Sequence, residues 1–213
     1  MKFEELLHIV GSEPVFDTGL LLAGNVDPDG VRKQLSLWTK AGKLYQLRRG
    51  VYALAPPYQQ SKPHPFVLAN HLARGTYVSC QSALAYYGLI PEYVPSVTSV
   101  TTSRTGCWET PLGRFEYRHI KQELFYGYRS EAFAMGQTAM VAGPEKALLD
   151  LVYLQPGGDA PEYLRELRLQ NLEQLDMDIL HRQAERVQSP KLVRAARHIK
   201  ELALAESEAY ETL

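Results

Sequence analysis

Apolar residues recur at helical spacing three times in the first sixty residues and then alternate with polar residues over two short runs. Phe3, Leu6, Leu7 and Val10, for example, lie three and four residues apart, as on one face of a helix. The pattern predicts three helices and a β-hairpin, over residues 3–11, 15–25, 29–42, 43–47 and 51–54.

Polar residues and glycines indicate where these elements begin and end. Asp17 is expected to cap the second helix, with Leu20–Leu22 on its buried side, and Gly24 and Asn25 are expected to end it. Asp29 is expected to cap the third helix, and Gly42 to end it. The hairpin turns at a loop of sequence Arg-Arg-Gly over residues 48–50.

The third helix has two different faces. Val31, Leu35 and Trp38 share one face, which is expected to be buried. A basic helix followed by a hairpin with a basic tip is typical of a winged helix-turn-helix, in which the helix enters the major groove and the hairpin touches the backbone. The expected DNA contacts are Arg32, which comes first on the helix and is the best candidate for a base contact, with Lys33, Ser36, Lys40, Arg48 and Arg49.

The rest of the chain mixes helices and strands. Helices are expected over residues 66–75 and 80–88, strands over 96–104, 114–120 and 139–142, and helices again from Pro144 to the end. Four prolines in residues 56–65 indicate a linker. We therefore expect an α+β protein with a winged helix-turn-helix at residues 1–57 and a mixed α/β domain with a helical C-terminal end at 58–213.

Charge is distributed unevenly along the chain. The total of 23 Lys and Arg against 24 Asp and Glu excludes binding to nucleic acid or membrane through overall basicity. Residues 31–50, however, hold six basic and no acidic residues, whereas residues 131–213 hold nine basic and fourteen acidic ones. The basic segment is therefore a local candidate for nucleic-acid binding.

Membrane, metal and catalytic signals are weak in this sequence. No apolar run approaches a membrane span and no signal peptide is recognisable, so a cytoplasmic location is expected. Cys80 and Cys107 do not form a zinc motif, and the six histidines lack ligand spacing. We expect no metal, no cofactor and no enzymatic activity.

Three groups of residues suggest other chemistry, but each has a simpler interpretation. Ser79, Cys80 and Ser82 lack the surroundings of a nucleophile elbow, and helix capping explains the serines. The carboxylates and lysine of residues 145–150 resemble a metal nuclease site, although Glu145 suits the first turn of a helix. Tyrosines of the larger domain are expected to fill a core more often than to stack on bases.

Four segments resemble the AbiEi-type antitoxins of bacterial type IV toxin-antitoxin systems, a family also described as transcriptional regulators. The segments are LRRGVYAL, YVSCQSALAYYGLIPE, SVTSVTTSRTGCWETPLGRFEYRHI and GPEKALLDLVYL. The resemblance implies an autorepressor that binds double-stranded DNA of its own operator and counters a nucleotidyltransferase toxin without a stable complex. It places the DNA-facing role on the six residues above, and a basic surface for the antitoxin role on Arg104, Arg114 and Arg118.

Two other functions remain open from the residues alone. The first is a ligand-responsive winged-helix regulator with an aromatic pocket, unrelated to a toxin. The second is a protein-interaction module that binds no DNA. The operator, the oligomeric state on DNA and the mechanism of toxin neutralisation are not encoded in any recognisable pattern.

Overall fold

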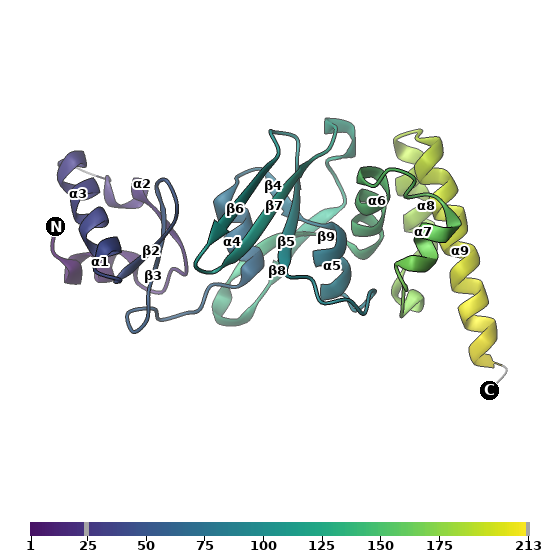
Figure 1. Cartoon of the computed structure of the whole chain (residues 1–213), viewed down its shortest axis with the longest axis horizontal. Coiled ribbons are helices and arrows are strands. Elements are labelled where there is room, and N and C mark those ends of the chain that lie inside the picture. Colours follow the sequence, from purple (N-terminus) through teal and green to yellow (C-terminus); the bar gives the residue numbers. More distant parts are fainter. Residues whose placement is uncertain (24–25, 212–213) are drawn as a thin grey trace.

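The computed structural model describes residues 1–23 and 26–211, and side chains as far as Glu206. Gly24, Asn25 and the last two residues, on which the ends of two expected helices fall, lie outside the described residues. The chain is an α+β protein whose parts follow one another along its long axis, with a small N-terminal part, a central sheet and a group of C-terminal helices (Figure 1).

The N-terminal part contains three helices and a small antiparallel sheet. Its elements are α1 (Phe3–Val10), β1 (Phe16–Asp17), α2 (Thr18–Leu21), α3 (Pro28–Lys40), β2 (Leu44–Arg48) and β3 (Val51–Leu54). The strand order is β1-β3-β2, and a bulge interrupts the pairing between Gln46 and Arg48. The first and third predicted helices and the hairpin therefore form within a few residues of their expected bounds. The second helix is shorter than expected, because Phe16 and Asp17 form β1 and α2 covers only Thr18–Leu21.

The start of α3 differs from expectation. Asp27, and not Asp29, is the N-cap, because its carboxylate accepts hydrogen bonds from the backbone N–H groups of Asp29 at 3.1 Å and Gly30 at 3.0 Å. Pro28 at the first helical position moves the cap two residues upstream. A Cβ atom at position 30 would lie 2.6 Å from the Asp27 carboxylate, so glycine there leaves room for the cap. Asp17 also makes no cap bond; its carboxylate instead pairs with Arg74.

The central part is a six-stranded mixed sheet. Its strands lie in the order β6-β7-β5-β4-β9-β8, and only the β5/β7 and β4/β9 pairs among them are parallel. The elements are α4 (Pro65–Leu72), β4 (Thr76–Val78), α5 (Cys80–Tyr86), β5 (Ser96–Thr101), β6 (Gly106–Thr110), β7 (Gly113–His119), η1 (Gln122–Leu124), β8 (Tyr128–Ala132), η2 (Ala134–Gly136) and β9 (Thr138–Ala142). The expected helices and strands form, and β4, β6 and β8 are additional.

The C-terminal end is helical, as predicted for the described residues. It comprises α6 (Pro144–Leu154), α7 (Pro161–Glu166), η3 (Leu172–Gln174), α8 (Met177–Arg186) and α9 (Pro190–Glu211). Helix α6 lies between the sheet and the last helices (Figure 1), and eight consecutive residues of it, Glu145–Val152, are buried. No helix within the described ranges is long and apolar enough to cross a membrane.

The hairpin belongs to two cores at once. One face of β2 and β3 packs against α1 and α3, where Leu44, Tyr52 and Leu54 join a small apolar cluster. Leu47 and Val51 belong instead to the large cluster of the sheet and the C-terminal helices. The predicted linker thus separates two segments that share apolar contacts through the hairpin.

A buried ion pair lies inside the large core. Lys146 and Asp150, one turn apart on α6, form an ion pair in which both side chains are almost completely buried. Asp150 also accepts hydrogen bonds from the Tyr77 hydroxyl at 3.0 Å and the Ser79 hydroxyl at 2.7 Å. The ammonium group of Lys146 lies 5.0 Å from the centre of the Tyr126 ring. The network therefore joins α6 to β4 and to the start of α5.

We expect Lys146→Met to lower the free energy of unfolding by about 3–5 kcal/mol, because it leaves the Asp150 carboxylate buried without its cation. Urea denaturation measures the loss. Lys200→Met, on the exposed surface of α9, is the control and is expected to change stability by about 0.5 kcal/mol at most. Equal effects of the two substitutions would contradict a stabilising role of the pair.

Candidate nucleic-acid interface

Helix α3 presents its polar face to solvent. Val31, Leu35 and Trp38 are buried against the small core, as predicted. The predicted DNA contacts of this helix, Arg32, Lys33, Ser36 and Lys40, are exposed on the opposite side, where Asp29 and Leu37 are exposed as well. The structure therefore places four of the six candidates on one accessible helix.

Arg32 forms an ion pair with Asp29, which lies just before the basic segment of residues 31–50. Its guanidinium group lies 2.9 Å from the Asp29 carboxylate, and both side chains are largely exposed. An exposed pair of this kind is weak and is screened by salt. Arg32 can therefore exchange Asp29 for a phosphate or a base edge.

The two arginines of the hairpin differ in position. Arg49 is exposed at the tip, where the Gly50 carbonyl accepts hydrogen bonds from the Thr18 N–H at 2.8 Å and hydroxyl at 3.2 Å. Arg48 is half-buried, and its Nε atom is buried without a hydrogen-bond partner among the described residues. Burial raises the pKa of Tyr117 on β7, and the nearby charge of Arg48 opposes this shift. Arg48 thus lies toward the central sheet.

Lys43, also counted in the basic segment, is not free either. Its ammonium group lies 4.5 Å from the centre of the Phe3 ring and 5.8 Å from that of Tyr58. These cation–π contacts tie the start of the hairpin to α1 and to the chain after β3. The accessible basic surface is therefore α3 together with Arg49.

The three arginines predicted as a basic surface of the larger domain, Arg104, Arg114 and Arg118, have different surroundings. Arg114 lies 3.0 Å from Glu116 and 3.8 Å from Glu109, so its charge is matched. Arg104 is exposed in the loop between β5 and β6. Arg118 is exposed and, with Glu116, lines a cavity of about 340 Å³.

The serine and cysteine group has structural roles different from capping. Ser79 occupies the N-cap position of α5 without a side-chain cap bond, and Ser82 accepts a hydrogen bond from the Thr98 N–H at 2.8 Å. Cys80 is buried, and burial, followed by the nearby Asp150 charge, raises the pKa of its thiol to about 12. A thiol with this pKa is a poor nucleophile at neutral pH. The capping expectation for these serines was therefore wrong.

Glu145 and the tyrosines also have structural partners. Glu145 accepts a hydrogen bond from the Asp176 N–H at 2.9 Å and so joins α6 to the segment before α8. The hydroxyls of Tyr87, Tyr117 and Tyr126 donate to backbone carbonyls, as expected for tyrosines that fill a core. Tyr93, by contrast, is 89% exposed. Within the part of the chain that the structure covers, no three His, Cys, Asp or Glu residues are grouped as metal ligands.

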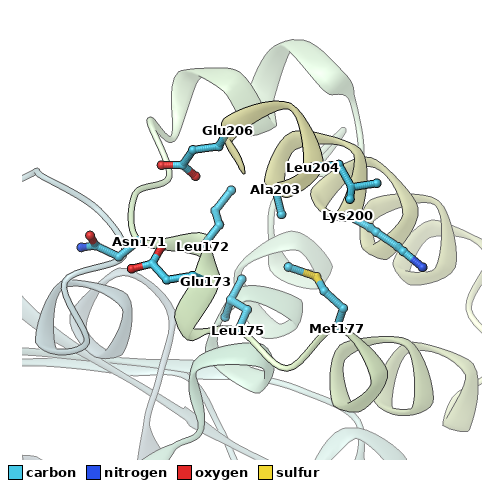
Figure 2. A pocket seen from close by; sticks show the side chains of 9 residues that line it. All are labelled: Asn171, Leu172, Glu173, Leu175, Met177, Lys200, Ala203, Leu204 and Glu206. Atoms are coloured by element: carbon cyan, nitrogen blue, oxygen red, sulfur yellow. The ribbon is translucent and has the colours of Figure 1, made fainter. Parts of the chain in front are cut away.

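A second cavity lies at the other end of the molecule. It has a volume of about 460 Å³ and is bounded by η3, the start of α8 and the last turns of α9. Figure 2 shows the aliphatic side chains of Leu172, Leu175 and Met177 directed toward Ala203, with Glu206 and Lys200 at opposite borders. The exposed surface of this lining is mainly apolar, although Asn171, Glu173, Lys200 and Glu206 also belong to it.

Comparisons with known proteins support the fold only. No protein-family model and no curated protein matches the chain. The crystal structure of the RV2827C protein from Mycobacterium tuberculosis is similar, with a TM-score of 0.55 and 17% sequence identity over 92% of this chain and 75% of that chain. The arrangement of elements is therefore shared across nearly the whole chain, while function has to be argued from the residues.

The cap of α3 can be tested directly. Asp27→Ala is expected to lower the free energy of unfolding by about 1 kcal/mol. Asp27→Asn is expected to lower it less, because the single amide oxygen of asparagine keeps one of the two backbone hydrogen bonds that the two carboxylate oxygens accept. Urea denaturation measures both. A larger loss in Asp29→Ala than in Asp27→Ala would show that Asp29 caps the helix after all.

Proposed function

We propose that this chain is an AbiEi-type antitoxin that represses its own operon, with its first 57 residues acting as a winged helix-turn-helix. The order α1-β1-α2-α3-β2-β3 supports this assignment, since it supplies a helix pair followed by a hairpin. The observation that carries the DNA-binding part is the exposed face of α3, where Arg32, Lys33, Ser36 and Lys40 lie opposite a buried apolar face.

In this proposal, α3 enters the major groove and Arg49 reaches a phosphate beside it. Arg32 is the fifth residue of α3 and lies toward the N-terminal end, the part of a recognition helix that contacts base edges, and its fork of donors suits a guanine. Lys33, Ser36 and Lys40 contact phosphates or base edges along the same face. Arg48 is left out of the interface because it lies toward the central sheet.

DNA binding is tested by fluorescence anisotropy with labelled DNA from upstream of the gene, a shuffled duplex and a series of salt concentrations. The native duplex is expected to bind more tightly, and Arg32→Ala to remove most of this preference, by about 1–3 kcal/mol. Arg49→Met is expected to lower the slope of log affinity against log salt by about 1. Arg48→Met is the matched control at the adjacent residue and is expected to leave that slope unchanged.

Equal affinity for both duplexes would contradict autorepression through α3. Absence of binding to either duplex would favour the protein-interaction module. If Arg48→Met lowered the salt slope as much as Arg49→Met, Arg48 would contact DNA as well, which would contradict its assignment to the side of the hairpin that lies toward the central sheet.

The antitoxin part of the proposal rests on the resemblance of the four sequence segments, and the protein is proposed to act on a nucleotidyltransferase toxin without a stable complex. Co-expression with a nucleotidyltransferase encoded beside this gene is expected to restore growth. Arg32→Ala is expected to restore growth equally when both genes are expressed from foreign promoters, because DNA reading and neutralisation use different parts of the chain. Continued growth arrest with the wild-type chain would contradict the antitoxin role.

One observation favours the second candidate, a ligand-responsive regulator. The cavity beside Arg118 lies in the central part, and β2 of the hairpin contacts β6 of the same sheet. Strand β6 lies between β7, which lines this cavity, and β2 of the proposed DNA-binding part.

A further inference from the structure

The cavity beside Arg118 collects polar side chains from separate elements. Arg118 comes from β7, Thr98 from β5, Gln81 from α5 and Glu92 from the loop before β5. The volume of about 340 Å³ falls within the range of small-ligand sites. Four chain segments thus converge on a space large enough for a small molecule.

Three of these side chains have polar groups that no other side chain or backbone group of the described residues pairs with. Arg118, Gln81 and Glu92 form no side-chain hydrogen bond or ion pair with any residue that the structure describes. Arg118 is exposed to solvent on one side and lines the cavity together with Cys80. A guanidinium group facing a cavity without a protein carboxylate as partner is suited to bind an anion.

The cavity also contains negative charge, which restricts the ligand. Glu92 is unpaired, and Glu116 lies on the same face of β7 as Arg118 with its charge shared with Arg114. A ligand with only anionic groups would be repelled by these carboxylates. A ligand that carries one positive and one negative group satisfies Arg118 and Glu92 together.

The apolar residues of the cavity favour a ligand without a further charged group. Leu151 and Leu154 of α6 and Val94 of the loop also line the cavity, together with Tyr93, which is 89% exposed. Apolar walls with a few fixed polar groups are typical of small-molecule sites. We propose that this cavity binds a free α-amino acid with an uncharged side chain, its carboxylate on Arg118 and its ammonium group on Glu92.

The proposal goes beyond DNA binding and neutralisation, and its test uses no DNA. The full chain is mixed with each of the twenty amino acids, and thermal unfolding is followed by fluorescence. At least one uncharged amino acid is expected to raise Tm, since a ligand of the folded state stabilises it. Isothermal titration calorimetry with that amino acid then gives Kd.

Variants of exposed residues identify the site. Arg118→Gln is expected to weaken binding about tenfold or more, because a charge-assisted hydrogen bond is lost. Glu92→Gln is expected to weaken it less, and Arg104→Gln, an exposed arginine outside the cavity, not at all. Amidation of the ligand carboxylate is expected to weaken binding to the wild-type chain and to have little further effect in Arg118→Gln.

Three results would overturn the proposal. They are no Tm change with any amino acid, unchanged Kd in Arg118→Gln, and binding of a nucleoside monophosphate in preference to every amino acid. Anisotropy of Arg118→Gln with operator DNA and no ligand is expected to equal that of the wild type. Loss of ligand binding and loss of DNA binding are therefore separable outcomes.

Discussion

The buried carboxylate of Asp150 joins the first helix of the C-terminal end, α6, to the central part of the molecule. It neutralises Lys146 on its own helix and accepts hydrogen bonds from Tyr77 on β4 and Ser79 at the start of α5. A buried charge is tolerated only where every partner is in place, so these three contacts fix α6 and α5 against the sheet. The same two helices form walls of the cavity beside Arg118. The geometry of the proposed ligand site therefore depends on an interaction that contributes no group to it.

A second constraint is that the hairpin has buried apolar residues on both of its sides. One side of β2 and β3 completes the small core with α1 and α3, and the other side joins the large core. A change in the packing of the central sheet would therefore shift the hairpin. The hairpin packs against Trp38 and Leu35, so the shift would reach α3. Apolar packing thus provides a physical connection between the proposed DNA-binding face and the rest of the molecule.

Charge along the chain separates into exposed groups that are free to bind and groups that hold the fold. Lys33, Lys40 and Arg49 are exposed, and Arg32 is held only by a weak surface pair. Lys43 and Arg48, from the same basic segment, lie against aromatic rings or toward the central sheet. The number of basic residues in a segment therefore overestimates its binding surface, because some of them stabilise neighbouring elements.

The sequence by itself determined most of the helices, the hairpin and the outward face of α3, because the spacing of apolar residues and the positions of proline and glycine act within a few residues. It did not determine the second helix, part of which is strand β1. It did not distinguish Arg48 from Arg49, which have the same chemistry and adjacent positions. Strand β8, exposed at the sheet edge, had no apolar alternation to reveal it. Only the tertiary structure decided that Lys146 and Asp150 are buried and that Arg118 faces a cavity. These outcomes depend on which distant segment covers each side chain, and that is set by packing between elements far apart in the sequence.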